Sequence, residues 1–395
     1  MLGIKLGIGL TSIPILILFV LPVHTAIIHV PSDYSKIQWA VDNASIGDTI
    51  FVEDGTYVEN LDVYKQLEIR SKNGSFNCII KAANPDDHIF EIRADHVGIT
   101  GFKIEGSTKA GIHLCGNYCS ISNNIISDNY IGVHLSQSSS NNVTNNTIVS
   151  NDFGVVVFGS NNSDVVGNTI NSSEYAGVYL LYSNDNGIVN NKISNAYVGI
   201  LLSYFSNGNC IMDNDISENK NGIYLWYSSG NSIVNNTVEL NTYGINLTSS
   251  SSNEIYFNNF NNTNNCYSVN STNLWNSTVA ISYAYEGERF VSYIGNYWSE
   301  YSCVDLNDDG ICDDPYIIGE NNTDYYPLVV YSSSYLVGST LGDVNGDGSV
   351  DVLDLTYLVN VILGESSPTA CSDVNGDGSI DVLDLTYLVN IILGS

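Results

Sequence analysis

The fold is decided by residues 209–225, Asn-Cys-Ile-Met-Asp-Asn-Asp-Ile-Ser-Glu-Asn-Lys-Asn-Gly-Ile-Tyr-Leu, whose pattern returns 22 residues later in residues 231–247, Asn-Ser-Ile-Val-Asn-Asn-Thr-Val-Glu-Leu-Asn-Thr-Tyr-Gly-Ile-Asn-Leu. Each copy holds three short segments of alternating apolar residues, separated by Asn, Ser and Gly. A glycine marks the same place in seven copies, at spacings of 21 to 23 residues: Gly111, Gly132, Gly154, Gly177, Gly199, Gly222 and Gly244. Two asparagine columns keep the same period: Asn124, Asn146, Asn168, Asn191, Asn214, Asn236 and Asn258, and Asn186, Asn209, Asn231 and Asn253.

This period predicts stacked coils. Alternation indicates strands with one buried face, and three such strands per copy suit one coil of a right-handed parallel β-helix, with neighbouring coils about 4.8 Å apart. Ile and Leu then fill the interior. Asn tolerates left-handed backbone at the corners, and its amide can bond to the next Asn in the stack. We expect an all-β domain of about ten coils of about 22 residues each. A leucine-rich repeat is excluded, because its Leu spacing and helical segments are missing.

A repeat protein needs caps, and the N-terminal cap is expected over residues 31–44, where Ile37, Ala40 and Val41 keep helical spacing. Residues 35–60, with Gly-Asp-Thr-Ile-Phe-Val and Gly-Thr-Tyr-Val-Glu-Asn, resemble the entry of pectate-lyase-like β-helices. Residues 27–330 resemble the NosD-like, carbohydrate-binding and sugar-hydrolase group, including the exit motifs Gly295-Asn-Tyr-Trp-Ser and Asp324-Tyr-Tyr-Pro-Leu. The resemblance implies a polysaccharide ligand. It assigns no catalytic residues, because the sequence contains no lyase or polygalacturonase active-site signature.

A duplicated acidic module ends the chain. Residues 343–364 and 373–394 differ only at Val350/Ile380 and Val361/Ile391. Each copy opens with oxygen side chains at loop positions 1, 3, 5, 9 and 12 and a glycine at position 6, which is calcium-loop spacing. The carboxylates repel one another until a cation binds, so we expect folding here to depend on Ca²⁺. The predicted ligands are Asp343, Asn345, Asp347, the Ser349 carbonyl, Asp351 and Asp354, and Asp373, Asn375, Asp377, the Ser379 carbonyl, Asp381 and Asp384.

Helical spacing follows each loop but precedes neither, so the module resembles a small all-α type I dockerin with two calcium loops. The resemblance implies a cohesin partner on a scaffold or surface protein. In the dockerin family, certain loop positions help determine which cohesin is bound, and they correspond here to Val352, Leu353, Val382 and Leu383. Later in each helix, Val-Asn stands where many dockerins carry basic residues, which leaves the cohesin type open. The near-identical halves suit docking in two orientations; a calcium-stabilised tail without a partner is the alternative.

A third acidic loop carries Asp305, Asn307, Asp309 and Asp313 at calcium-loop spacing, but Tyr316 replaces the final acid. The loop either binds a third calcium ion or is a solvated acidic turn, and the sequence fits both interpretations. Cys303 with Cys312, and Cys115 with Cys119, are local disulfide candidates in an exported chain. The sequence divides into a signal peptide (1–26), the β-helix with its N-terminal cap (27–282), a C-terminal cap (283–330), a linker (331–340) and the dockerin (341–395).

Composition excludes some partners. A formal charge of −30, from 42 acidic and 12 basic residues, argues against nucleic acid, which needs a basic footprint. Lys5, an apolar run and a small-residue site predict a cleaved secretory signal, with an uncleaved anchor as the alternative. No other run is long enough to span a bilayer. We therefore expect a secreted, extracellular or surface-associated protein.

On each Gly strand, residues two and four after the glycine should point outward. These columns and the position after them carry aromatic side chains that suit stacking against sugar rings: Phe158, Tyr179, Tyr182, Tyr204, Tyr224, Trp226 and Tyr227. Tyr179 and Tyr224 should sit two coils, or roughly 10 Å, apart. A face of ordinary stacked aromatics is the alternative.

Catalysis has fewer candidates. Lys192 is expected one coil from Asp215, with Asp213, Glu218 and Glu239 nearby, and paired carboxylates can serve sugar hydrolysis. A cross-coil salt bridge between Lys192 and Asp215 explains the same residues without a reaction.

The third class of function is a copper-accessory role. His113, Cys115 and His134 should share one outward patch, and imidazole with thiolate suits copper, which the NosD resemblance implies. The sequence thus predicts a secreted, calcium-dependent β-helix that binds polysaccharide and is a candidate lyase or hydrolase of it. A structural glycan-binding protein and a copper-accessory protein are the alternatives.

Overall fold

The computed structural model describes residues 25–286, 288–319, 321–337, 344–345, 350–366, 368, 372, 374 and 379–393. The secretory signal expected over residues 1–26 falls almost entirely outside them. Within the described residues, no helix is long and apolar enough to cross a membrane.

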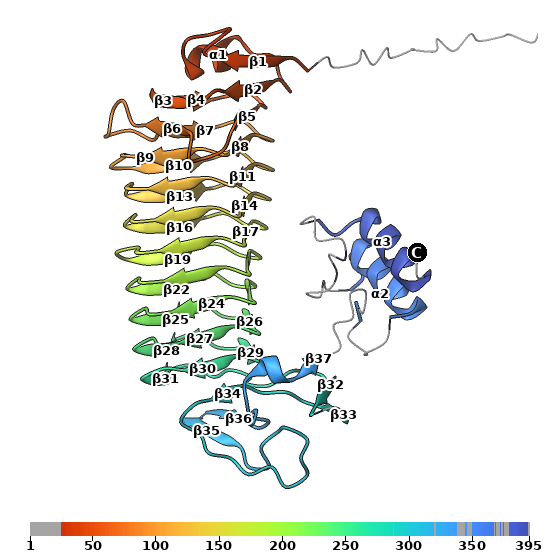
Figure 1. Ribbon diagram of the computed structural model, residues 1–395. Helices are drawn as coiled ribbons and strands as arrows, with labels where there is room; N and C mark the ends of the chain where they lie inside the picture. The colour runs from red at the N-terminus through yellow and green to blue at the C-terminus, as the bar shows by residue number, and fades with distance from the viewer. Residues whose placement is uncertain are drawn as a thin grey trace, which may run out of the picture.

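Three long parallel sheets wind together as a β-helix (Figure 1). Sheet A comprises β1 (Ile27–Val30), β2 (Thr49–Val52), β5 (Glu68–Ser71), β8 (Gly98–Thr100), β11 (Ser120–Ser122), β14 (Asn142–Thr144), β17 (Asp164–Val166), β20 (Gly187–Val189), β23 (Cys210–Met212), β26 (Ser232–Val234) and β29 (Glu254–Tyr256). Sheet B comprises β3 (Gly55–Val58), β6 (Cys78–Lys81), β9 (Lys103–Glu105), β12 (Ile125–Ser127), β15 (Thr147–Val149), β18 (Thr169–Asn171), β21 (Lys192–Ser194), β24 (Asp215–Ser217), β27 (Thr237–Glu239), β30 (Asn259–Asn261) and β34 (Tyr297–Trp298). Sheet C comprises β4 (Leu61–Val63), β7 (Phe90–Ile92), β10 (Ala110–Leu114), β13 (Ile131–Ser136), β16 (Phe153–Phe158), β19 (Ala176–Leu181), β22 (Val198–Ser203), β25 (Asn221–Trp226), β28 (Tyr243–Thr248) and β31 (Asn264–Val269). The predicted parallel β-helix is confirmed.

The register of the sheets follows the sequence repeat. In sheet A, Ile188 pairs with Ile211, which is followed by Ile233 and Ile255 in the next coils. All four side chains are fully buried. Like residues therefore stack on like, and the interior is one continuous column of Ile, Leu and Val.

The glycine column lies where each coil enters sheet C, and the neighbouring coil leaves no space for a side chain there. A Cβ added to Gly222 would lie 2.6 Å from the Gly244 carbonyl oxygen and 2.6 Å from Cγ1 of Val238. Contacts this short force the backbone or the core to move, so glycine is required by packing.

The two predicted asparagine columns are buried hydrogen-bond ladders. The Asn214 side-chain oxygen accepts from the backbone N–H of Asn191 (2.9 Å), and its amide donates to the Asn236 side-chain oxygen (2.9 Å) and the Ile188 carbonyl (2.7 Å). Asn214 is 2% exposed, so these bonds satisfy polar groups that water does not reach. A third ladder, missed from sequence because Ser173 and Ala196 interrupt it, comprises Asn129, Asn151, Asn219, Asn241 and Asn262.

The expectation that ladder asparagines take the left-handed corner conformation is wrong. The positive φ falls on the residue before each of them, for example 52° at Asn235, before Asn236, and 58° at Phe257, before Asn258. None of the ladder asparagines themselves has a positive φ.

The N-terminal cap is α1 (Ile37–Asn43), which buries Ile37, Ala40 and Val41 as predicted. The helix has no side-chain N-cap of its own. Instead the Glu59 carboxylate accepts from the backbone N–H groups of Ile37 (3.0 Å) and Gln38 (3.1 Å). This satisfies two of the amides that a helix start leaves unpaired.

The C-terminal cap contains an antiparallel sheet of β32 (Ile281–Tyr285), β33 (Glu288–Ser292) and β37 (Leu336–Val337), the hairpin β35 (Tyr316–Gly319) and β36 (Asn322–Asp324), and the 3₁₀ helix η1 (Ser332–Ser334). The linker expected over residues 331–340 is therefore misplaced at its start. Residues 331–337 belong to the cap, because Ser332 bonds to Asn259 (2.7 Å) and β37 pairs with β32.

Asp324 joins this cap to the last coil. Its carboxylate accepts from the backbone N–H of Asn296 (2.7 Å) and from Nε1 of Trp298 (2.9 Å). The side chain is fully buried, and desolvation raises the pKa of Asp324 to about 7.

The C-terminal module contributes α2 (Val352–Ile362) and α3 (Val382–Leu393). Its small core consists, among the described residues, of four buried side chains: Val344, Leu358, Val374 and Leu388. The predicted all-α module with one helix after each loop is confirmed.

Candidate functional site

A continuous row of rings lies on the outward side of sheet C, and we call it the aromatic ridge: Phe158, Tyr182, Tyr204, Trp226 and Tyr227. Successive ring centroids are 6.5 Å (Phe158–Tyr182), 5.7 Å (Tyr182–Tyr204), 4.6 Å (Tyr204–Trp226) and 5.7 Å (Trp226–Tyr227) apart. Tyr182 and Tyr227 remain 50% and 45% exposed. Five of the seven aromatic residues predicted to contact sugar thus form one surface over four consecutive coils.

The other two, Tyr179 and Tyr224, stand in a separate column, because Leu201 pairs with both and separates their rings. Tyr179 stacks on Phe153 instead (6.0 Å), and Phe153 also stacks on the half-exposed Tyr175 (5.2 Å). Phe153 and Tyr175 were missed from sequence. They precede the glycine of their coil, whereas the prediction considered only positions after it.

The three ridge tyrosines adopt a backbone conformation that disfavours bulky residues. Tyr182, Tyr204 and Tyr227 have φ values of 53°, 49° and 52°. A left-handed conformation costs a bulky residue roughly 1 kcal/mol or more, and half-exposed rings regain little of it by burial. At the equivalent corner, neighbouring coils carry smaller or polar residues: Gln137, Gly159, Ser249 and Asn270.

The catalytic candidates are not gathered into an acid pair. Lys192 Nζ lies 3.7 Å from Asp215 Oδ2, and both side chains are about half exposed or more, so they form the surface salt bridge that was the simpler alternative. Asp213 accepts from the Asn235 amide (2.6 Å), and Glu239 accepts from the Tyr331 hydroxyl (3.4 Å). Across the described chain, none of the three carboxylates is bonded to another.

The predicted histidine patch is a stack of rings. His113 lies 4.3 Å from His88, with planes 19° apart, and 5.0 Å from His134. The plane of His134 is tilted by 39° from that of His113, and Cys115 Sγ lies 3.8 Å from His113 Nε2. His88 Nδ1 already accepts from the Ala110 N–H (3.2 Å). Burial lowers the pKa of His113, and that of His134 to about 4. In the described residues no group of three ligating side chains can hold a metal ion, so these residues do not fit a copper site.

Cysteine pairing agrees in part with expectation. Cys303 and Cys312 form a disulfide. Cys115 and Cys119 are both free, because Cys119 is buried beneath the corner whereas Cys115 points to solvent.

Each calcium loop ends in a buried carboxylate. Asp354 is 0% exposed, and its two oxygens accept from the backbone N–H groups of Asn345 (3.0 Å) and Asp351 (2.9 Å). In the second copy Asp384 is equally buried and accepts from Asp381 (2.9 Å). An anionic group held inside an acidic loop suits a bound cation. Six predicted ligands lie outside the described residues: Asp343, Asp347, Ser349, Asp373, Asn375 and Asp377.

The predicted cohesin-binding residues lie together at the first turn of each helix. Val352, Leu353, Val382 and Leu383 are between 59% and 66% exposed. Asp351 caps α2 by accepting from the Leu353 N–H (2.7 Å), and Asp381 accepts from Leu383 in the same way. The two copies thus present equivalent apolar tips.

The third acidic loop is closed by its own backbone. Asp305 accepts from the N–H groups of Asp309 (3.2 Å) and Gly310 (2.8 Å), and Asp313 accepts from Leu306 (2.8 Å). Asn307 donates to Asp309 (3.0 Å). A calcium ion at this loop stays a prediction.

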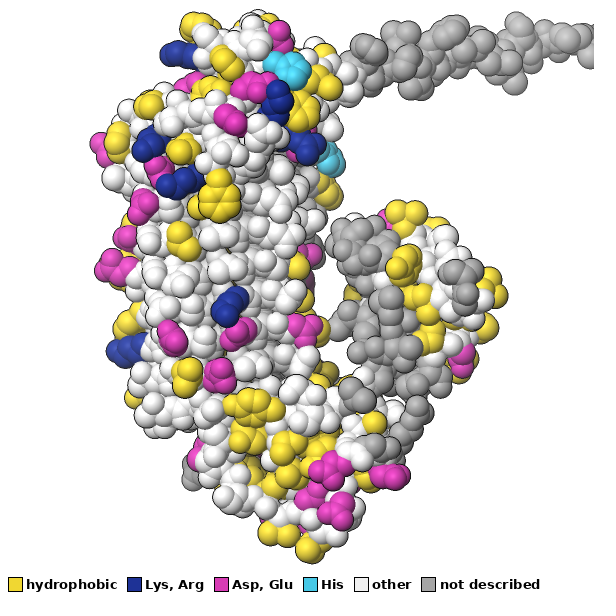
Figure 2. Space-filling model, viewed as in Figure 1, with side chains coloured by type: hydrophobic (Ala, Val, Ile, Leu, Met, Phe, Trp, Pro, Cys, Tyr) yellow, Lys and Arg dark blue, Asp and Glu magenta, His cyan; other side chains and the backbone are white. Residues whose placement is uncertain are grey.

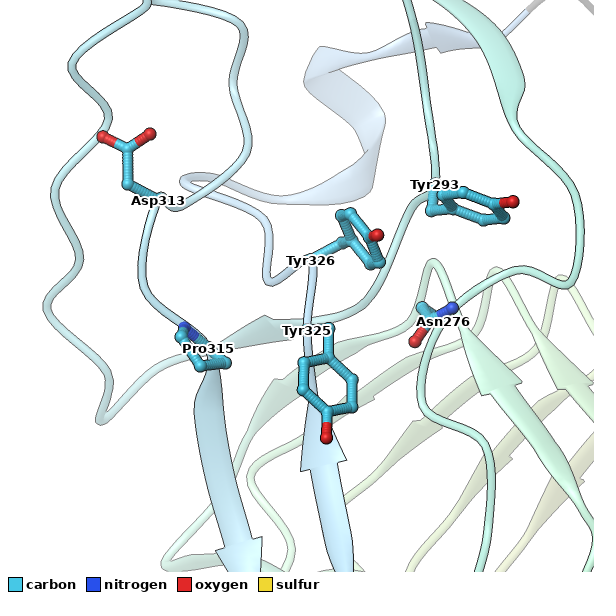
Figure 3. Close-up of a pocket in the computed structure, with 6 residues that line it drawn as sticks. All are labelled: Asn276, Tyr293, Asp313, Pro315, Tyr325 and Tyr326. Carbon is cyan, nitrogen blue, oxygen red and sulfur yellow. The ribbon is translucent and has the colours of Figure 1, made fainter.

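A hollow of about 530 Å³ opens on the C-terminal cap (Figure 3). Its lining comprises Asn276, Tyr293, Asp313, Pro315, Tyr325 and Tyr326. The rings of Tyr293 and Tyr326 are 5.3 Å apart, and Asp313 lies on the opposite side of the hollow. This cluster was not predicted from the sequence, because its members come from separate loops of the C-terminal cap.

Charge is unevenly distributed over the surface. Figure 2 shows Lys and Arg gathered over the N-terminal coils, while the later coils in view are mostly uncharged with scattered acidic side chains. The C-terminal cap carries an apolar patch beside acidic side chains (Figure 2).

Two family models match the chain. The family described as periplasmic copper-binding protein (NosD) matches residues 41–220 and 197–303. The dockerin type I domain matches residues 341–393.

Individual relatives are distant. A cell surface glycoprotein of Methanothermus fervidus is 39% identical over 101 residues, which are 25% of this chain and 16% of that protein. The chain thus spans only a small part of that relative. ORF18 of Geobacillus virus E2 has a similar structure, with a TM-score of 0.55, 16% identity, and coverage of 75% of this chain and 68% of that one. The structure of XylC with xylose gives a TM-score of 0.52, 12% identity, and coverage of 66% and 70%. At these identities the structural likeness shows the fold alone.

Proposed function

Since the chain belongs to the NosD family through its β-helix and ends in a type I dockerin domain, we propose that it is an exported adaptor whose β-helix binds polysaccharide. The dockerin attaches this β-helix, in a calcium-dependent way, to a cohesin on a scaffold or surface protein. The aromatic ridge is the single observation that carries the polysaccharide part.

The ridge supports polysaccharide binding because exposed rings on a rigid sheet keep their spacing when a ligand arrives. Stacking on sugar then orders few side chains, which limits the entropic cost of binding. A protein of similar fold, XylC, has been solved with xylose, and a cell surface glycoprotein is 39% identical to this chain over 101 residues. The xylose complex is consistent with a sugar ligand, and the cell surface glycoprotein with a place outside the cell.

The C-terminal module supports docking through its duplicated design. Two equivalent apolar tips, Val352-Leu353 and Val382-Leu383, are exposed at helix starts next to acidic loops. Calcium bound by each loop would hold its tip in place, which explains why docking should require the ion.

Polysaccharide cleavage stays a separate prediction. Lys192 and Asp215 already satisfy each other as an ion pair, and Asp213 and Glu239 have their own partners. A copper-accessory role is not part of the proposal, because no group of three ligating side chains in the described residues can hold a metal ion.

The test uses the full chain. Immobilised cohesins exported by the same organism should capture it with Ca²⁺ and release it in EDTA, and the captured chain should retain a polysaccharide from a panel. Capture that survives chelation would count against calcium-dependent docking. Failure to retain any polysaccharide would contradict the proposal that the β-helix binds polysaccharide.

A further inference from the structure

The outward surface of sheet C is free of charge over most of its length. The seven strands β13, β16, β19, β22, β25, β28 and β31 contain no Asp, Glu, Lys or Arg. Sheets A and B do carry charge over the same coils: Asp164, Lys192, Asp215, Glu239 and Glu254. The absence of charge is therefore a property of one face and not of the whole β-helix.

The aromatic ridge runs along this uncharged face parallel to the axis of the β-helix. Phe158 ends β16, Trp226 ends β25, and Tyr182, Tyr204 and Tyr227 lie in the corners that follow β19, β22 and β25. The ridge thus spans four coils, or about 14 Å. Centroid distances of 4.6–6.5 Å leave no break along the row. A long, unbroken row of rings suits an extended chain of sugar units lying along it.

Residue type sets the ridge apart from the rest of the corner column, since the whole column shares one left-handed backbone conformation. Tyr182, Tyr204 and Tyr227 occupy the left-handed region in three successive coils, where Gly, Ser or Asn would be relaxed. Tyr182 and Tyr227 are about half exposed, so burial of their rings offsets only part of the cost of this conformation. Other corners of the β-helix hold bulky residues in the same conformation, so the unbroken row of rings, and not the strain alone, marks the ridge.

Charge also decides between possible occupants. The chain carries a formal charge of −30, which repels polyuronates, sulfated glycans and a second copy of itself. A face without Lys or Arg offers an anionic sugar no counter-charge. An uncharged ligand avoids both costs and uses the rings and tyrosine hydroxyls directly.

We infer that the aromatic ridge binds an uncharged polysaccharide whose chain runs along the β-helix axis, with one sugar unit per coil. The inference rests on the proposed function and narrows it, because it names the ligand class and the residues that contact it. It excludes uronate-rich glycans, the substrates for which a basic and calcium-rich groove would be needed.

The test combines a ligand panel with a variant that should fold well. The full chain is run in native gels containing xylan, mixed-linkage glucan, mannan, polygalacturonate or alginate. We expect retardation by at least one uncharged glycan and none by the two polyuronates. The triple variant Tyr182→Asn, Tyr204→Asn, Tyr227→Asn should lose retardation at least 10-fold, while its thermal midpoint stays unchanged or rises, because Asn tolerates the left-handed conformation.

Tyr118→Asn is the matched control. Tyr118 is 59% exposed and has a φ of 56°, but it stacks on His96 and not on the ridge. This variant should keep full retardation. Retardation that survives the triple variant, or retardation by a polyuronate alone, overturns the inference while leaving polysaccharide binding in place. No retardation by any glycan defeats the proposed function itself. A wild-type oligomer that the triple variant converts to a monomer, measured by sedimentation, reassigns the ridge as a self-association surface.

Discussion

The β-helix and the C-terminal module are both built from sequence repeats, yet the repeats are stabilised in different ways. In the β-helix each coil buries its Ile and Leu against two neighbours, and ladders such as Asn191–Asn214–Asn236 satisfy the polar groups between them. The module has two copies only. Its described core consists of Val344, Leu358, Val374 and Leu388, and each copy also buries a carboxylate.

The difference shows what a repeat needs in order to fold. A stack of coils supplies its own stabilising contacts, since every added coil extends both core and ladders. Two short helices do not bury enough apolar surface, so a bound cation has to supply the missing free energy. Removal of calcium should therefore unfold the C-terminal module and leave the β-helix folded.

The largest effect is expected from calcium removal. In EDTA, the amides of α2 and α3 should lose nearly all protection from hydrogen exchange, because Asp354 and Asp384 are then buried without a counter-charge. The strands of sheets A, B and C should keep their protection. Helices that stay protected without calcium would show that the module folds on its apolar core alone, and the comparison would fail.

A smaller, local effect is expected from breaking one ladder. Asn214→Leu leaves the Asn191 N–H buried without a partner and removes one hydrogen bond from each of the Ile188 and Met212 carbonyls, of which Met212 keeps the bond from the Asn190 N–H (3.0 Å). At about 1–3 kcal/mol for the orphaned donor and about 1 kcal/mol for each lost bond, the free energy of unfolding should fall by roughly 4 kcal/mol. Denaturant unfolding of the β-helix at saturating calcium measures this.

The matched control for the ladder is Thr147→Ala, on the exposed side of β15. This variant should change the free energy of unfolding by no more than about 0.5 kcal/mol. Equal effects of the two variants would mean that the ladders contribute no more than the surface does.

The smallest effect concerns pH and the seam between the β-helix and its C-terminal cap. Burial raises the pKa of Asp324 from 3.8 to about 7, so between these values the folded chain binds more protons than the unfolded chain. Its stability should therefore fall as pH rises through this window, by about 2–3 kcal/mol between pH 5 and pH 7.5. Thermal unfolding at pH 5, 6 and 7.5, with calcium present, measures the slope.

Replacing the titrating group isolates this contribution. Asp324→Asn should flatten the slope, whatever its effect on overall stability, whereas Asp128→Asn at an exposed corner should leave the slope unchanged. A slope that persists in Asp324→Asn would assign the pH dependence to other carboxylates.

Much of the fold was predictable because the repeat is local and regular. The inward positions after each glycine, the stacking of Ile on Ile, the cap helix and the two loop-plus-helix copies all follow from spacing. The third asparagine ladder was harder, because Ser173 and Ala196 interrupt its column. The start of the linker was misplaced, because nothing in residues 331–337 indicates that β37 pairs with β32, about fifty residues earlier.

The residues of the candidate site also divide into those that were predicted from the sequence and those that were not. Five ridge residues were predicted from the columns that follow the glycines, whereas Tyr179 and Tyr224 were grouped with them although Leu201 separates the two. Side-chain direction alone brings Phe153 against Tyr179. Loop geometry alone brings the tyrosines of the cap hollow together. The ion pair of Lys192 with Asp215 was foreseen from register alone, because one coil of the repeat separates them.

The sequence by itself determined the period, the stacking register and the calcium-loop spacing, because each of these depends on residues close together in the chain or one repeat apart. Only the tertiary structure decided which outward side chains meet. It separated the ridge from Tyr179, stacked the histidines and buried Asp324 in the seam. These outcomes depend on ring orientation, corner conformation and loop packing, which the spacing of residues does not specify.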